Sequence, residues 1–184
     1  MKKYTVDCIY DLILSVLSDV GMNITLKQDN SGINMSYNFI GDYVSFDSKR
    51  LIEAHKEILL PLPLEVYIKT ITLHELGHAI DRQALQESLI RTLEIYEMKK
   101  QYSFKEIYNN DRLLTMILEE HIMNIKFEET AWDNAEQLNK EVHLVDMNEF
   151  EVIKAHSLST YRKLYQEDLN LYNELFNHKV LQLA

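Results

Sequence analysis

The sequence predicts an α+β fold, in which a mostly helical single domain carries a small three-stranded antiparallel sheet near its N-terminus. Three observations support this prediction. The chain has 184 residues, which suits one compact domain. Residues 22–27 and 33–39 alternate between apolar and polar side chains, as strands do, and a third short strand follows at 43–46. All four glycines and both prolines lie within the first 77 residues, so few breaks interrupt the helices expected after them.

An amphipathic helix is expected at the start of the chain, before Gly21. Its apolar residues recur at helical spacing: Val6, Ile9, Tyr10, Ile13, Leu17 and Val20. Alternating segments follow at 22–27 and 33–39, and Asp-Asn-Ser-Gly at 29–32 is a strong turn signal between them. Residues 22–39 are therefore predicted to form a β-hairpin.

The predicted third strand covers residues 43–46, and a helix follows it. Asp47 or Ser48 can cap that helix, which should run over about 48–59. An exposed sheet edge at 42–46 would be able to hold an extended peptide as an added strand.

The next helix is expected to lie at the centre of the domain. Two prolines precede it, and it should run from Pro63 to about residue 84. Its apolar residues are Val66, Ile68, Ile71, Leu73, Leu76 and Ile80. A helix this apolar is expected to be buried. Further helices are predicted at about 85–100, 104–108, 110–140 and 147–177.

Charge and composition narrow the function classes. The net charge of −10 opposes direct binding to the phosphates of nucleic acid. No apolar run approaches the roughly 20 residues needed to cross a bilayer. Asp7 and Asp11 interrupt the apolar stretch behind the N-terminal lysines, which argues against a signal peptide. The single cysteine, Cys8, fits a reducing compartment. We therefore expect a cytoplasmic protein that binds neither membranes nor nucleic acid.

The strongest functional pattern is His-Glu-Leu-Gly-His at 74–78, inside the predicted central helix. His74 and His78 are four residues apart, so both imidazoles project from one helix face, with Cβ atoms roughly 5–6 Å apart. Zinc binds nitrogen ligands in a tetrahedron, and these two histidines can supply two of its corners. Glu75 lies about 100° around the helix. That position suits a general base which takes a proton from a zinc-bound water.

The alternative to a metal site is that both histidines only form hydrogen bonds or packing contacts with neighbouring residues. That alternative is less favourable here, because two imidazoles without hydrogen-bond partners in an apolar, buried helix would cost free energy. A catalytic zinc site also needs a third protein ligand. The metzincin pattern would place Gly at 81 and His or Asp at 84, but this chain has Asp81 and Ala84, which excludes that class. A glutamate from a later helix remains, and spacing alone does not choose it. The four candidates are Glu119, Glu120, Glu128 and Glu129.

Gly77 is the unusual residue within the motif. Glycine costs about 1 kcal/mol relative to alanine inside a helix, so its presence predicts that another group approaches the backbone closely there. Asp81 follows His78 by three residues. Its carboxylate is a candidate to orient a ligand imidazole, and pairing in solvent is an equal alternative.

Two segments of the chain resemble the ImmA/IrrE family of bacterial and phage metallopeptidases. The first is Thr-Leu-His-Glu-Leu-Gly-His-Ala-Ile at 72–80, and the second is Glu-Glu-Thr-Ala-Trp-Asp-Asn-Ala at 128–135. The family carries His-Glu-x-x-His and, on a later helix, Glu-x-x-Ala-(Trp or Asn)-x-x-Ala. Ile-Gly-Asp-Tyr at 40–43, before the Ser-Lys-Arg-Leu helix start, is similar to the family's segment ahead of the motif helix. The likeness covers roughly residues 35–140.

The resemblance implies a zincin-like fold with His74, His78 and Glu128 as zinc ligands and Glu75 as the base. Glu129 is the alternative third ligand, because its spacing to a later aspartate matches thermolysin-type enzymes. Glu128 is preferred because it puts the alanines of the second motif in register. The metal-binding core would span about 35–140, followed by a C-terminal helical extension at 141–184.

The function implied is a zinc-dependent metalloendopeptidase that cleaves a protein, in this family a transcriptional repressor of a phage or mobile element. Zn²⁺ is the expected cofactor, although such a ligand set also accepts manganese, cobalt or iron. One alternative is a non-catalytic anti-repressor that binds its partner on the same fold. Another is a lethal-factor-like toxin protease, which His-Glu-Leu-Gly-His-Ala-Ile-Asp at 74–81 also resembles.

Overall fold

The structure is a computed structural model, and it describes residues 4–58 and 60–177. These residues group into two compact units. The first unit contains the described residues up to Gln83 together with Glu129–His156, and the second contains Ala84–Glu128 together with the described residues from Ser157 on. Helices dominate both units, and the sheet lies in the first, which confirms the mostly helical α+β class. A single domain over the whole chain stays a prediction.

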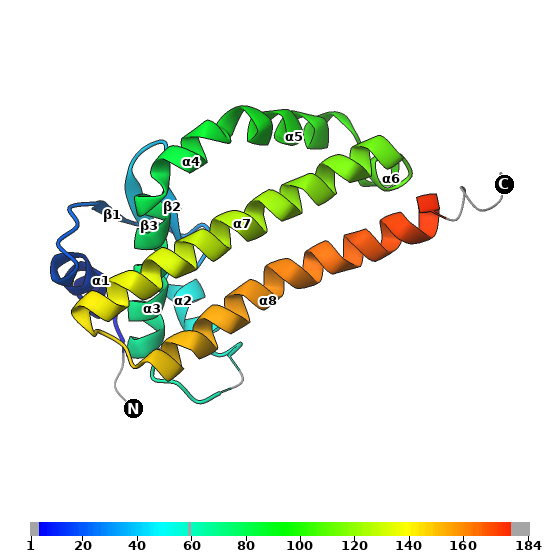
Figure 1. Cartoon of the computed structure of the whole chain (residues 1–184). Helices are drawn as coiled ribbons and strands as arrows, with labels where there is room; N and C mark the ends of the chain where they lie inside the picture. Colours follow the sequence, from blue (N-terminus) through cyan, green and yellow to red (C-terminus); the bar gives the residue numbers. More distant parts are fainter. Residues whose placement is uncertain (1–3, 59, 178–184) are drawn as a thin grey trace. The chain divides into compact units, whose positions relative to one another are not determined.

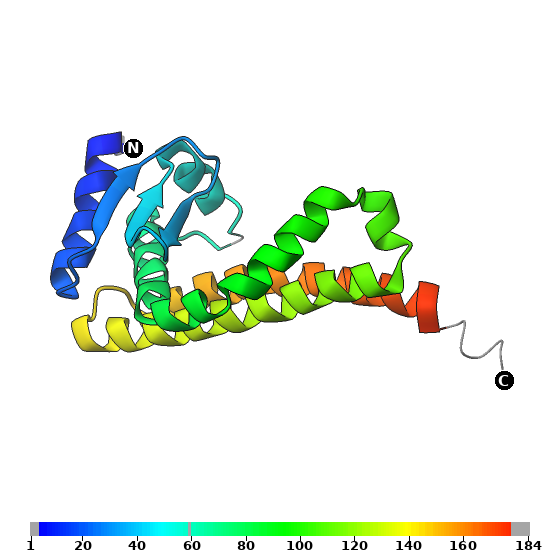
Figure 2. The ribbon, with the colours of Figure 1, turned by 90° about the horizontal axis from the view of Figure 1, so that it is seen from above.

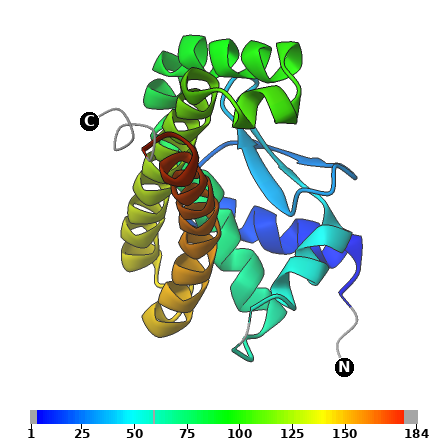
Figure 3. The same ribbon diagram turned by 90° about the vertical axis from the view of Figure 1, so that its right-hand side faces the viewer.

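The first unit begins with a helix, three short strands and two further helices (Figure 1). The elements are α1 (Val6–Asp19), β1 (Thr25–Gln28), β2 (Met35–Asn38), β3 (Tyr43–Phe46), α2 (Ser48–His55) and α3 (Leu64–Ile80). The side chain of Thr5 caps α1 by accepting the N–H of Cys8. α1 packs against α3, and both helices lie on the same side of the sheet (Figure 3).

The sheet is mixed, so the predicted antiparallel sheet is wrong. Its strand order is β1-β3-β2, with β1 parallel and β2 antiparallel to β3 (Figure 2). The predicted hairpin over 22–39 therefore does not form, because β3 lies between its two strands. Backbone N–H groups of Asp29 and Asp47 donate to the carbonyls of Phe46 and Asn34, which fixes the loop that carries the chain across. β3 is the central strand, so the edge expected at 42–46 is wrong too, and β2 is an edge.

One face of the sheet belongs to the core of the first unit. Met35 and Tyr37 of β2 lie opposite Phe46 and Val44 of β3, and all four side chains are buried. The ring of Phe46 lies 6.2 Å from that of Tyr10 on α1. The predicted alternation therefore marks the buried face correctly at Met35 and Tyr37, because successive strand residues point to opposite sides, whereas Ile33 of the same alternating segment is exposed.

One of the two predicted cap residues is right, while several helix boundaries differ. The helix predicted at about 85–100 is two helices, Arg82–Glu87 and Leu89–Gln101, and the α-helix predicted over 147–177 ends at Tyr172. Asp47 caps α2 by accepting the N–H groups of Lys49 and Arg50, over 3.0 and 3.2 Å. α2 ends at His55, four residues before the predicted end at residue 59, which lies outside the described residues. α3 ends at Ile80, because Asp81 leaves helical geometry with φ −91° and ψ 19°.

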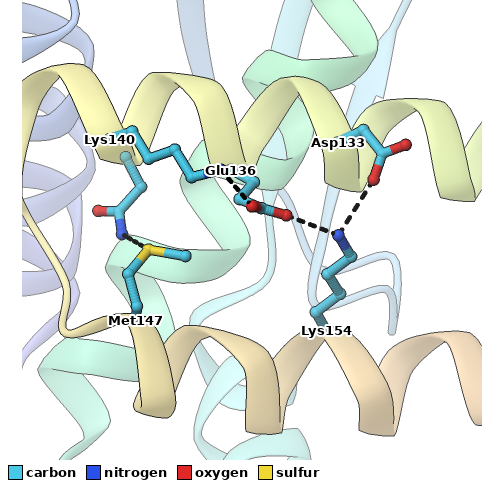
Figure 4. Close-up of polar contacts among 6 residues, drawn as sticks. Asp133, Glu136, Lys140, Met147 and Lys154 are labelled. Atoms are coloured by element: carbon cyan, nitrogen blue, oxygen red, sulfur yellow. Dashed lines mark hydrogen bonds and ion pairs between the residues drawn. The ribbon is translucent and has the colours of Figure 1, made fainter.

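Two long helices run through both units: α7 (Asp111–Val142) and α8 (Met147–Tyr172). Within the first unit, the ammonium of Lys154 on α8 pairs with Asp133 and Glu136 of α7, at 3.1 and 3.0 Å (Figure 4). Asn139 closes the turn between the helices, since its Nδ2 donates to the carbonyl of Val145 and its Oδ1 accepts that residue's N–H. α7 is therefore fixed against α8 where it enters the first unit.

The second unit has its own core. Its elements are α4 (Arg82–Glu87, mostly in this unit), α5 (Leu89–Gln101), α6 (Phe104–Tyr108), the unit's parts of α7 and α8, and a π-helical turn at Asn173–Asn177. The buried cluster comprises Ile95, Met98, Ile107, Leu114 and Ile117. Arg91 of α5 holds Glu119 of α7 with two hydrogen bonds.

Candidate metal centre

Helix α3 carries the His-Glu-Leu-Gly-His motif and is the buried helix that its apolar sequence predicts. Pro63 precedes its first residue, and the helix is almost continuously buried from Tyr67 to Gly77. Two buried threonines, Thr70 and Thr72, return their hydroxyls to carbonyls one turn earlier, over 2.9 and 2.8 Å. The helix thus satisfies its own interior polar groups, which leaves the motif as the chemically distinctive part.

Three potential ligands meet beside α3. His74 and His78 project from the same face, with ring centroids 4.6 Å apart and ring planes at 71°. The carboxylate of Glu128, on α7, completes the group, and the ligand atoms of the three residues all lie within 4.8 Å of one another. Among the described residues this is the group of His, Cys, Asp and Glu side chains that can hold a metal ion. Glu129, the alternative third ligand, is not part of it.

The donor set fits zinc. Two imidazole nitrogens and one carboxylate oxygen are a recurrent ligand set of catalytic zinc sites, which keep a fourth position open for reactants. His74 and Glu128 are also buried, with exposed fractions of 5% and 9%, so water screens their charge and dipole interactions weakly.

An aromatic side chain positions the first histidine. The indole of Trp132 stacks on the imidazole of His74, with centroids 4.3 Å apart and planes 22° apart. Phe150 contacts the indole edge-on at 5.6 Å, and both aromatic residues are fully buried. Trp132 therefore belongs to the core of the first unit, but the sequence did not indicate its contact with His74. The available signal was its spacing, since Trp132 follows Glu128 by one helical turn.

The crossing of α3 and α7 depends on Gly77. A Cβ atom added there would lie 2.0 Å from the carbonyl oxygen of Ala131, a distance at which atoms overlap. Asn134 donates from its Nδ2 to the carbonyl of Gly77 over 3.1 Å, and so links the two backbones. The close approach predicted from a helical glycine is therefore confirmed. The point of contact on α7 is Ala131, three residues after Glu128.

Glu75 is held by strand β2. Its Oε2 accepts the backbone N–H of Tyr37 over 2.7 Å, and its side chain is buried with an exposed fraction of 7%. Tyr37 faces Val44 across the β2–β3 ladder, so an N–H that reaches Glu75 points away from β3. Glu75 therefore lies in the same helical turn as His74 with one carboxylate oxygen fixed. The sequence alone did not indicate this partner.

The other candidates lie elsewhere. Glu119 pairs with Arg91, which lowers the pKa of that carboxyl, and Glu120 pairs with Lys99. The side chain of Asp81 makes no hydrogen bond or ion pair within residues 4–58 and 60–177, and its backbone N–H caps α3 by donating to the carbonyl of Gly77. Its role in orienting a ligand histidine stays a prediction.

Comparison with models of protein families, with curated proteins and with solved structures gives no match to this chain. The ImmA/IrrE resemblance therefore stays an interpretation of the two motifs. Within the described part of the chain, none of the helices combines the length and the apolar character that crossing a membrane requires.

Proposed function

We propose that this protein is a zinc metallopeptidase that hydrolyses peptide bonds in a protein substrate. The observation that carries the proposal is the convergence of His74, His78 and Glu128, with Glu75 in the same turn of α3. A histidine pair that served packing alone would not need a buried carboxylate from a separate helix at its side.

The residues have distinct roles in this proposal. His74, His78 and Glu128 would hold the ion, and Trp132 would keep the ring of His74 in place. A zinc ion supplies Lewis acidity, which polarises the scissile carbonyl and makes water more acidic at neutral pH. Glu75 takes the proton from the attacking water and passes it to the amine that leaves.

The outer edge of β2 suits the substrate better than residues 42–46, because β3 is the central strand and both of its edges are paired. An extended peptide can pair with the outward backbone groups of an edge strand other than the N–H of Tyr37, which is donated to Glu75 and places that carboxylate beside this edge of β2. A peptide aligned along β2 would bring its backbone next to the general base. The substrate class that the motif resemblance suggests is a DNA-binding repressor of a phage or mobile element, cleaved in the cytoplasm.

Metal content and cleavage test the proposal separately. Purified wild-type protein should contain about one zinc ion per chain, as judged by elemental mass spectrometry. Glu75→Gln should keep the metal and lose peptide-bond cleavage by about a thousandfold or more, because its amide is not a base. Cleavage is measured by mass spectrometry, first on a peptide library derived from a proteome. The same assay is then applied to the purified repressor that is encoded nearest to the gene of this protein.

Glu120→Gln is the matched control, since Glu120 lies on the same helix as Glu128 and pairs with Lys99. It should retain both metal and cleavage. A wild-type protein without bound metal would contradict the proposal. If the Glu75→Gln protein still prevents the repressor from acting, without cleaving it, the result would favour the non-catalytic anti-repressor. Cleavage of host proteins in place of a repressor would favour the toxin-like protease.

A further inference from the structure

Three polar contacts join the β2 segment to α3 and the residues that follow it. Before the strand, Nδ2 of Asn34 donates to the hydroxyl of Tyr67 on α3, over 3.1 Å. In the middle, a backbone N–H of the strand holds Glu75 at 2.7 Å. Beyond the strand, Nε of Arg82 donates to the carbonyl of Phe39 over 2.9 Å. The contact to Glu75 therefore lies between two anchors.

Arg82 makes a second bond that leads back to Glu75. Its Nη1 donates to Oδ2 of Asp42 over 2.7 Å. The other oxygen of Asp42 accepts the phenol of Tyr37 over 2.6 Å. Tyr37 is also the residue whose backbone N–H holds Glu75. A short series of hydrogen bonds thus runs from Arg82, the first residue of α4, through the β2–β3 turn and Tyr37 to the proposed general base.

The position of this N–H needs such a chain because β2 is an edge strand. The ladder to β3 fixes the inward-facing backbone groups of β2, whereas the N–H of Tyr37 faces outward. Its distance from Glu75 therefore depends on how firmly the ends of the strand are tied to α3. The turn that Arg82 grips is itself constrained, because Asp42 adopts a left-handed φ of 54°.

The exposure of the pair indicates a local effect. The side chains of Arg82 and Asp42 are 35% and 50% exposed, and ion pairs at such positions contribute little to the stability of the whole protein. Arg82 also donates to a backbone carbonyl, which a charge pair alone would not require. The guanidinium of Arg82 thus binds the β2–β3 turn at two points, a side chain and a backbone carbonyl, and two contacts from one planar group fix the orientation of that turn.

We propose that Arg82 is a positioning residue, which grips Asp42 and Phe39 and thereby keeps the N–H of Tyr37 on the carboxylate of Glu75. The part of this inference that concerns catalysis rests on the proposed peptidase function. The part that concerns structure does not, because it is measured on the Tyr37 amide itself.

Amide hydrogen exchange, followed by NMR on the full chain, tests the structural part. Arg82→Met removes both donors while keeping an unbranched apolar stem, and Asp42→Asn removes the charge of its partner. Each variant should speed exchange at the Tyr37 amide by about fivefold to tenfold, because the strand opens locally more often. The midpoint of global unfolding should stay close to that of wild type.

Arg91→Met is the matched control. The side chain of Arg91 is also 35% exposed and is paired with Glu94 and Glu119, in the second unit. It should leave the Tyr37 amide unchanged. Arg82→Lys should recover part of the protection, because lysine can reach Asp42 but lacks the second donor of the guanidinium. Unchanged exchange at Tyr37 in both Arg82→Met and Asp42→Asn overturns the proposal.

Activity then tests the catalytic part. In a protein shown to cleave peptides, Arg82→Met should lower kcat by about tenfold, because the base is misplaced. Zinc affinity should remain within about twofold, because neither Arg82 nor Asp42 is a proposed ligand. Faster exchange with unchanged kcat would overturn the catalytic part. Faster exchange in a protein whose wild type never cleaves peptides would uphold the structural part and contradict the proposed function.

Discussion

Two histidine–carboxylate groups of this protein differ in what surrounds the carboxylate. On α3 and α7, two imidazoles and Glu128 gather around one point. In the second unit, the carboxylate of Asp168 lies 2.8 Å from Nε2 of His121 and accepts the hydroxyl of Tyr108 at 3.0 and 3.1 Å. The Asp168 group joins α6, α7 and α8 with one histidine and one phenol. A histidine beside a carboxylate is therefore not by itself a metal site. The number of potential ligands, and whether their ligand atoms lie close together, distinguish the two groups.

Removing a histidine from each group should break this comparison most clearly. His78→Ala should weaken zinc binding by about a hundredfold or more, since it deletes a direct ligand. His121→Ala should leave zinc affinity unchanged. The chain has one tryptophan, and Trp132 stacks on His74, so quenching of its fluorescence by Co²⁺ measures occupancy directly. Equal loss of binding in both variants would contradict the assignment of the metal centre.

The next largest effect is expected where the two helices of the metal centre cross. Gly77→Ala places a Cβ atom against the carbonyl of Ala131 and should lower the free energy of unfolding by about 3 kcal/mol. It should also weaken zinc binding, because α7 carries Glu128. Both are measured by chemical denaturation and Co²⁺ titration.

Gly21→Ala is the control for the added methyl group. It meets no atom within 4 Å but has a φ of +69°, so only backbone strain of about 1 kcal/mol is expected, with zinc binding intact. A Gly77→Ala protein as stable as Gly21→Ala would show that the helices can separate without cost.

The sequence predicts local features of this fold better than pairings between distant segments. Helical spacing predicts α1, and the prolines ahead of α3 predict where that helix begins. Asp47 is one of two residues predicted to cap α2, because a cap acts within three residues of its own position. The strand positions were also close to those observed. The pairing of β1 with β3 was missed, because a turn signal at 29–32 favours a hairpin but does not exclude a wider loop.

The same distinction applies to the candidate site. His74, Glu75 and His78 follow from spacing on one helix, and the close approach at Gly77 follows from the cost of glycine there. Spacing did not choose the third ligand, because α7 can cross α3 at several heights. The contact between Tyr37 and Glu75 uses a backbone N–H, which every residue except proline carries, so no side chain marks it.

The smallest predicted effect concerns the phenol of the Asp168 group. Burial, followed by the hydrogen bond to Asp168, raises the pKa of Tyr108 to about 12, from an ordinary value of 10.0. A raised pKa favours the protonated form in the folded state, so the stabilisation is complete below pH 10. It is lost as the pH rises from about 10 to about 12. Absorbance at alkaline pH should therefore show Tyr108 ionising at higher pH than exposed tyrosines, and Tyr108→Phe should remove one tyrosine from that late phase.

Zinc binding at neutral pH should not change in the Tyr108→Phe variant, because Asp168 lies outside the His74–His78–Glu128 group. A late phase of undiminished amplitude would show that the phenol is not held by Asp168, and a fall in zinc affinity would show that the two histidine–carboxylate groups are coupled.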